Sequence, residues 1–167
     1  IKGYASLALE NGKDLNADIK NFIMQMKIAS ERLAQLVNDL LEIARSEAGR
    51  LEIRGTAMNI VEPLRAVLAE LAPLAAEKNI KIVYEPGIVP DIFADPARIK
   101  EIAVNLVGNA IKYTVGAGTV TVRHEARGNE VITHISDTGL GISPEAQQRL
   151  FEKFYRVQTE KTQEITG

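Results

Sequence analysis

The sequence contains no cysteine and no tryptophan, and aromatic residues make up only 5% of its 167 residues. The absence of cysteine excludes disulfide bonds, thiolate metal sites and cysteine nucleophiles. A large charge of one sign is also missing, since 20 basic and 22 acidic residues leave a formal net charge of −2. This balance argues against a strongly basic nucleic-acid binder. No apolar run approaches the ~18 residues of a membrane span, and no signal peptide is recognisable. We therefore expect a globular chain without nucleic-acid or membrane contacts.

The first 48 residues have the pattern of a helical hairpin. Residues 1–10 show helical spacing, and Asn11-Gly12 predicts the end of that helix. A second helix follows, with Asp18 as a candidate cap, and its apolar residues from 19 to 43 recur three and four positions apart as heptads. Further apolar positions widen this stripe beyond a two-stranded seam. We expect two chains to contribute one hairpin each to a four-helix bundle. A long helix packed on its own domain is the alternative.

From Leu51 onward, the pattern changes to mixed helices and strands. Expected strands are 51–54, 81–85, 119–124 and 131–136, and expected helices are 59–78, 95–113 and a short one from Ser143. Asn59 and Asp95 are the expected N-caps of the first two of these helices. Gly128-Asn129 predicts a hairpin turn between the last two strands. The fold class is therefore α+β, with a helical hairpin at 1–48 followed by a mixed module at 51–167.

Two asparagines lie four residues apart in the helix 95–113, so Asn105 and Asn109 share a face, with Lys112 and Tyr113 one turn further on. Asparagine is unfavourable inside helices, whereas carboxamide oxygens suit Mg²⁺ that is shared with phosphates. The pair is thus a candidate metal site, and two solvated polar residues are the alternative. The opposite face is expected to carry Ile102, Leu106 and Val107.

The segment Asp137-Thr138-Gly139-Leu140-Gly141-Ile142 follows the last expected strand. Its glycines allow the backbone to approach a ligand closely. A buried Asp137 at the strand end is a candidate acceptor for the hydrogen bond of an exocyclic amine. An ordinary turn is the alternative.

The third candidate segment is Phe151-Glu152-Lys153-Phe154-Tyr155-Arg156. Its aromatic residues are candidate anchors of a mobile lid, and Arg156 is a candidate phosphate contact. A plain amphipathic helix end is the alternative. No G-x-x-x-x-G-K-[ST] loop is present, and His124 and His134 lie in expected strands, where we interpret them as structural.

The order of these segments resembles sensor histidine kinases of two-component systems. The stretches N-L-V-G-N-A-I-K-Y, D-T-G-L-G-I and F-E-K-F-Y-R are similar to the family's N box, first glycine box and F box. The resemblance covers nearly the whole chain. It implies a dimerisation and phosphoacceptor hairpin at 1–48 and an ATP-binding domain of the α/β-sandwich type at 51–167.

The family's residue roles map onto matching positions of this chain. In the N box, the resemblance implies that Asn109 binds Mg²⁺, that Asn105 is its polar partner, and that Lys112 and Tyr113 contact phosphate and nucleotide. In the glycine box, it implies an adenine-binding carboxylate on Asp137. The remaining implied nucleotide-binding residues are Gly139, Gly141 and Ile142, the lid anchors Phe151 and Phe154, and a γ-phosphate contact, Arg156.

The implied activity is transfer of the γ-phosphate of ATP to a histidine of the hairpin, and then to an aspartate of a response regulator. A homodimer in the cytoplasm is the implied assembly. The phosphoacceptor histidine and a second glycine box are both missing from these 167 residues. We therefore expect a fragment that is cut at both ends and is inactive by itself. A non-catalytic, dimeric ATP-binding signalling module is the alternative function.

Overall fold

The computed structural model describes residues 16–50 and 52–152, together with Gly3, Ala8, Tyr155 and Val157. It divides into two units, Ile1–Glu52 and Ile53–Gly167. The predicted first helix lies outside the described residues except at Gly3 and Ala8, which are helical. The predicted loop from residue 158 onward also lies outside them.

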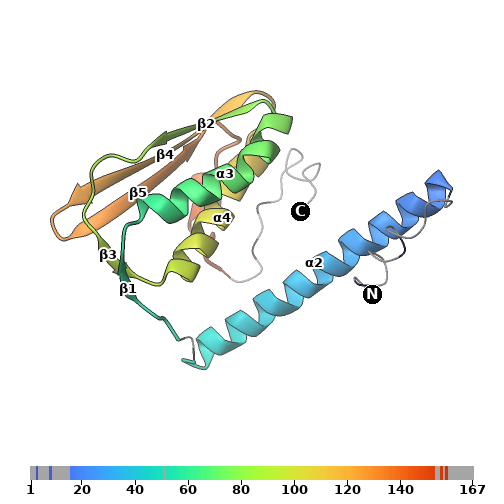
Figure 1. Cartoon of the computed structure of the whole chain (residues 1–167), viewed down its shortest axis with the longest axis horizontal. Coiled ribbons are helices and arrows are strands. Elements are labelled where there is room, and N and C mark those ends of the chain that lie inside the picture. Colours follow the sequence, from blue (N-terminus) through green and yellow to red (C-terminus); the bar gives the residue numbers. More distant parts are fainter. Residues whose placement is uncertain are drawn as a thin grey trace. The chain divides into compact units, whose positions relative to one another are not determined.

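Over residues 16–50, the first unit is formed mainly by the long helix α2, Ala17–Glu47 (Figure 1). The N-cap is Asn16 rather than the predicted Asp18, because Asn16 Oδ1 accepts the backbone N–H of Asp18 at 2.6 Å and that of Ile19 at 3.4 Å. Asp18 already lies in the first turn, where a carboxylate favours the positive end of the helix dipole. Gly49 follows the helix at φ +63°, a left-handed conformation that glycine readily adopts just after a helix.

Most of the heptad positions of α2 are exposed. Exposed fractions between 45% and 68% are found at Ile19, Phe22, Met26, Leu33, Leu36 and Leu40. Such a continuous apolar stripe is the kind of surface that a helical bundle buries. Among the described residues, no helix is both long and apolar enough to span a membrane.

The second unit begins with a small antiparallel pair, β1 at Thr56–Met58 and β3 at Ile92–Ala94. The predicted strand at 51–54 is wrong, since residues 52–55 form no strand and Ile53 is 67% exposed. Neither β1 nor β3 was predicted. Both errors have the same cause. A three-residue strand forms only where another strand pairs with it, and the alternation of apolar and polar residues within one segment does not show which strand that is.

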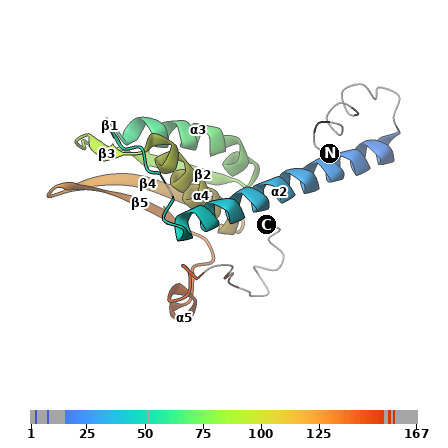
Figure 2. The same cartoon turned by 90° about the horizontal axis from the view of Figure 1, so that it is seen from below.

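The main sheet has the order β2–β4–β5 in the described part of the chain. Its strands are β2 at Ile80–Glu85, β4 at Gly118–Arg127 and β5 at Glu130–Asp137. Strand β2 runs parallel to β4, and β4 and β5 form the predicted hairpin, with Gly128 at φ +62° in its turn. Helices α3 (Val61–Glu77) and α4 (Pro96–Tyr113) lie on one face of this sheet, as Figure 2 shows. The short helix α5 spans Pro144–Gln147.

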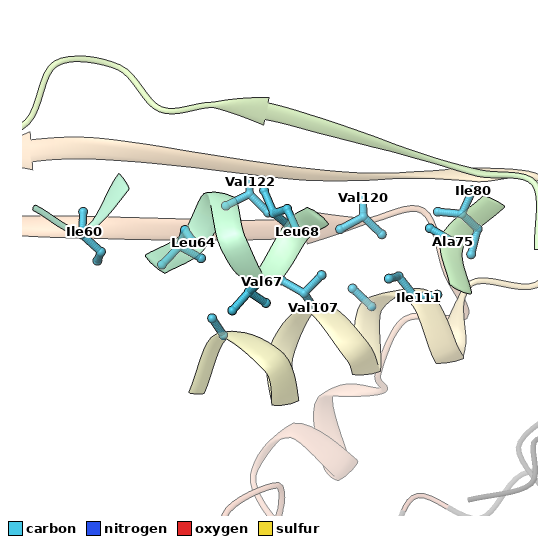
Figure 3. Close-up of a cluster of buried hydrophobic side chains, with 12 residues drawn as sticks. Ile60, Leu64, Val67, Leu68, Ala75, Ile80, Val107, Ile111, Val120 and Val122 are labelled. Atoms are coloured by element: carbon cyan, nitrogen blue, oxygen red, sulfur yellow. The ribbon is translucent and has the colours of Figure 1, made fainter. Parts of the chain in front are cut away.

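The core lies between the two helices and the sheet (Figure 3). The larger side chains that are at most 2% exposed are Leu64 and Val67 of α3, Val107 and Ile111 of α4, and Val120 and Val122 of β4. Burying each of these side chains contributes about 1.5–3 kcal/mol. This two-layer arrangement confirms the predicted α+β fold class and fixes the orientation of α4.

Capping residues set where α3 and α4 begin. Asn59 supplies the capping interaction of α3, because its Oδ1 accepts the N–H of Val61 at 2.9 Å, while Ile60 between them makes no side-chain cap and already has helical φ and ψ. Helix α4 has the predicted cap, since Asp95 Oδ1 accepts the N–H groups of Ala97 and Arg98. The backbone N–H of Arg54 donates to Asp95 Oδ2 at 2.9 Å, and this hydrogen bond is the main cause of the lowered pKa of Asp95.

Candidate functional site

Helix α4 presents the two asparagines to solvent. Its buried face carries Ala103, Val107, Ala110 and Ile111. Asn105 and Asn109 are exposed, and within the described part of the chain neither carboxamide has a hydrogen-bond partner. Their carbonyl oxygens are therefore available to a ligand.

The expected opposite face of α4 is wrong for two of its three residues. Val107 is buried, but Ile102 and Leu106 are 54% and 51% exposed. Seven residues make nearly two helical turns, so Ile102 lies on almost the same side of the helix as Asn109. The exposed side of α4 thus combines carboxamides with apolar side chains.

The last turn of α4 carries Lys112 and Tyr113, both half-buried. The ammonium of Lys112 lies 5.5 Å from the centroid of the Tyr113 ring. A cation at this distance is attracted by the face of the ring. The pair therefore places one positive charge and one aromatic ring beside each other at the end of the helix.

Strand β5 ends at Asp137, and the glycine loop, residues 137–142, follows. Asp137 is exposed rather than buried, and its Oδ1 accepts the N–H of Gly139 at 2.8 Å. In the part of the chain that the structure describes, β5 is an edge strand, so solvent can hydrate the carboxylate at its end and the sequence argument for burial fails here. The position leaves the second carboxyl oxygen open to a donor.

Backbone contacts join the glycine loop to the end of α4. The N–H of Leu140 donates to the carbonyl of Tyr113 at 3.2 Å. A Cβ on Gly139 would lie 2.6 Å from that same carbonyl oxygen and 2.7 Å from Asp137 Oδ1, so only glycine fits without a shift. Gly141 has φ +67°, which also favours glycine. These contacts bring together two segments that are well separated in the sequence.

A second contact with the end of α4 was not predicted from the sequence. The ammonium of Lys78, just after α3, donates to the carbonyls of Lys112 at 3.1 Å and Ile111 at 3.3 Å. In the sequence Lys78 marks only a helix end. No local signal could have shown that it reaches another helix.

The residues beyond the glycine loop are only partly described. Ile142 is exposed, and Phe151 is 99% exposed. Phe154 and Arg156 lie outside the described residues. The proposed roles of these residues as lid anchors and phosphate contact stay predictions.

The two histidines lie in the sheet, away from the asparagines. His124 is buried, with Nε2 2.8 Å from the Tyr84 hydroxyl and Nδ1 3.0 Å from the Thr133 hydroxyl, and burial lowers its pKa. His134 Nε2 lies 3.4 Å from a carboxyl oxygen of Glu125. The sequence did not reveal this carboxylate, because the hairpin pairing brings it close. Tyr84 and Thr133 account for both ring nitrogens of His124, which agrees with a structural role.

A metal ion at this site would depend on few protein ligands. No group of three or more histidine or carboxylate side chains that could hold a metal is present among the described residues. The unpartnered carboxamide of Asn109 fits Mg²⁺, which keeps waters and accepts phosphate oxygens as further ligands. The residues present therefore fit a metal that arrives with a phosphate-bearing ligand.

Two family models match the chain. One, described as His Kinase A (phospho-acceptor) domain, matches residues 1–49. The other, described as Histidine kinase-, DNA gyrase B-, and HSP90-like ATPase, matches residues 94–167 and includes both α4 and the glycine loop. The two models fall on the helical unit and on the mixed unit, respectively.

Similar proteins and solved structures also include histidine kinases. An uncharacterized sensor-like histidine kinase of Rhizobium meliloti (strain 1021) is 32% identical over 93% of this chain. The phosphate regulon sensor protein PhoR of Pseudomonas aeruginosa is 29% identical over 100% of it. The chain spans 30% and 38% of these two relatives. The crystal structure of full-length ShkA in complex with AMPPNP matches with a TM-score of 0.75 and 33% identity, over 89% of this chain and 32% of that one. With both family models matched in the expected order, the chain belongs to the sensor histidine kinases of two-component systems.

Proposed function

We propose that this chain binds Mg·ATP between the exposed side of α4 and the glycine loop. It would serve as the dimerisation and ATP-binding part of a protein histidine kinase. The ATPase family model supports this proposal, because it includes both elements. ShkA, whose crystal structure contains AMPPNP, supports it as well.

One observation carries the proposal: the hydrogen bond from Leu140 to the carbonyl of Tyr113. It brings the loop of Asp137 next to the turn that holds Lys112 and Tyr113. An adenine nucleotide has an amino group at one end and phosphates at the other. A carboxylate can accept a hydrogen bond from the amino group, and a cation can neutralise the phosphates. Asn109 lies one turn before Lys112 on the same helix.

Each residue has one proposed task. Asp137 accepts a hydrogen bond from the adenine amino group, and Gly139 and Gly141 let the backbone approach the base. Lys112 neutralises phosphate charge, and Asn109 supplies a carboxamide oxygen to Mg²⁺. When bound, Mg²⁺ would neutralise charge on the phosphates during phosphoryl transfer.

The reaction that we propose moves the γ-phosphoryl group from ATP to a histidine nitrogen, with ADP as the leaving group. The accepting histidine lies outside this chain, because its only two histidines are in β4 and β5. A response-regulator aspartate is the proposed next acceptor. We further propose that the hairpin of residues 1–48 dimerises, that residues 51–167 bind the nucleotide, and that the protein acts in the cytoplasm.

The test compares adenine with guanine nucleotides. Calorimetric titration of the 167-residue chain with Mg·AMPPNP is expected to show saturable binding, at least tenfold tighter than with Mg·GMPPNP. Guanine presents a carbonyl oxygen where adenine presents the amine, and the carboxylate of Asp137 repels it. Asp137→Asn is expected to remove most of this preference.

The matched control is Asp91→Asn, which removes the same charge from an exposed residue between β2 and β3. It should keep the preference of the wild type. An unchanged preference in Asp137→Asn would overturn the adenine assignment. Absence of saturable AMPPNP binding by the wild-type chain would overturn the proposed function itself.

A further inference from the structure

Each of the last four backbone carbonyls of α4 accepts a hydrogen bond. A helix leaves its last four carbonyls without partners inside the helix. Here the carbonyl of Ala110 accepts from the Thr114 N–H and hydroxyl, and that of Tyr113 accepts from the Leu140 N–H. The two carbonyls between them, of Ile111 and Lys112, both accept from the Lys78 ammonium.

Lys78 is itself held at a fixed point of the fold. Its backbone N–H donates to the carbonyl of Ala75, which closes the last turn of α3. Asn79 follows at φ +57°, and its carbonyl accepts the N–H of Gly118 at the start of β4 at 3.4 Å. The side chain therefore reaches α4 from a turn that is tied to both α3 and the sheet.

We propose that Lys78 is a positioning residue for the nucleotide site, acting through the last turn of α4. This inference rests on the proposed function, because Lys112 and Tyr113 belong to the nucleotide site. The positive charge of Lys78 is favourable at the negative end of a helix, and its two hydrogen bonds keep the final turn wound. When that turn is wound, the carbonyl of Tyr113 stays in reach of Leu140.

Loss of the Lys78 ammonium leaves the carbonyl of Lys112 to water, and leaves that of Ile111, a residue with no exposed surface, without a partner. Water satisfies an exposed carbonyl but does not hold it in place. The final turn then frays, and the glycine loop loses its fixed distance from Lys112. Nucleotide affinity falls, while the core of α3, α4 and the sheet stays packed.

The test measures the dissociation constant for Mg·AMPPNP at 15 °C, where the folded fraction of every variant is checked by circular dichroism. Lys78→Met is expected to weaken binding at least fivefold. Lys78→Arg keeps several N–H donors and the charge, and is expected to stay within twofold of the wild type. The matched control, Lys81→Met, removes the same charge from an exposed position of β2 and should also stay within twofold.

Hydrogen exchange separates positioning from simple stabilisation. The amide of Leu140 is expected to exchange faster in Lys78→Met, and bound AMPPNP should protect it less than in the wild type. A variant with a lower Tm but an unchanged dissociation constant would overturn the inference. If Lys78→Met does not fold, Lys78→Gln, which keeps a donor without the charge, takes its place under the same criteria.

Failure of the inference and failure of the proposed function give different results. Tight binding of AMPPNP by both the wild type and Lys78→Met refutes only the role of Lys78. Absence of binding by the wild type refutes the nucleotide site, and the role of Lys78 with it.

Discussion

The backbone N–H of Leu140 donates to the carbonyl of Tyr113 at 3.2 Å, which fastens the glycine loop to the end of α4. Gly139 stands beside this bond, against the same carbonyl. The close approach makes the loop and the helix end a single structural element. Substitutions at this contact should therefore affect both stability and nucleotide binding.

Gly139→Ala is expected to lower the free energy of unfolding by about 1–3 kcal/mol, because the added Cβ must displace the backbone carbonyl of Tyr113. AMPPNP binding should weaken as well. Gly108→Ala is the matched control, since a Cβ at this helical position meets nothing within 4 Å. Alanine is the better helix former there by up to about 1 kcal/mol, so this variant should be at least as stable as the wild type. Urea denaturation measures both, and equal stability of the two variants would contradict the tight contact.

Asn109→Ala is expected to reduce the dependence of nucleotide binding on Mg²⁺. In the wild type, AMPPNP should bind more tightly with Mg²⁺ than with EDTA, because the carboxamide oxygen completes the coordination of the ion. The variant should bind about equally in both buffers. Calorimetry under the two conditions measures the ratio. A ratio like that of the wild type would remove Asn109 from the proposed metal site.

The buried imidazole of His124 is expected to make the fold sensitive to acid. Burial lowers the pKa of His124 below its ordinary value of about 6.5. The unfolded state then binds more protons than the folded state between these two pKa values, so stability falls as the pH drops through about 6.5 toward the folded pKa. Urea midpoints at pH 7.5 and 5.5 measure this loss.

His124→Gln should show a smaller loss of stability between pH 7.5 and 5.5 than the wild type. His134→Gln serves as the control, since His134 is only partly buried. If both variants keep the wild-type pH dependence, the acid sensitivity comes from other groups.

The apolar stripe of α2 is expected to form a dimer interface. Leu36→Glu places a charge at a heptad position that is 58% exposed in the single chain, and burying an unpaired charge is costly. Sedimentation equilibrium should show at least a tenfold weaker dimer. Ala34→Glu, on the outward side of the same helix, should leave the dimer intact. A monomeric wild type would contradict the proposed bundle.

Local patterns predicted much of the fold. The heptad spacing predicted α2, Asp95 predicted the start of α4, and Gly128-Asn129 predicted the β4–β5 hairpin, because each depends on neighbouring residues. Strand β3 and the exposure of Ile102 escaped prediction. Both depend on which surface another element covers, and a single segment carries no information about that.

By itself, the sequence determined which chemical groups are available: two asparagines on one helix, a carboxylate before a glycine turn, and no cysteine. It also determined their order along the chain, which identified the family. Only the tertiary structure decided that Leu140 meets Tyr113 and that Lys78 meets the end of α4. These contacts join backbone groups of distant segments, and almost any residue supplies such groups. The core of α3, α4 and β4 brings them together, so they follow from packing and not from a motif.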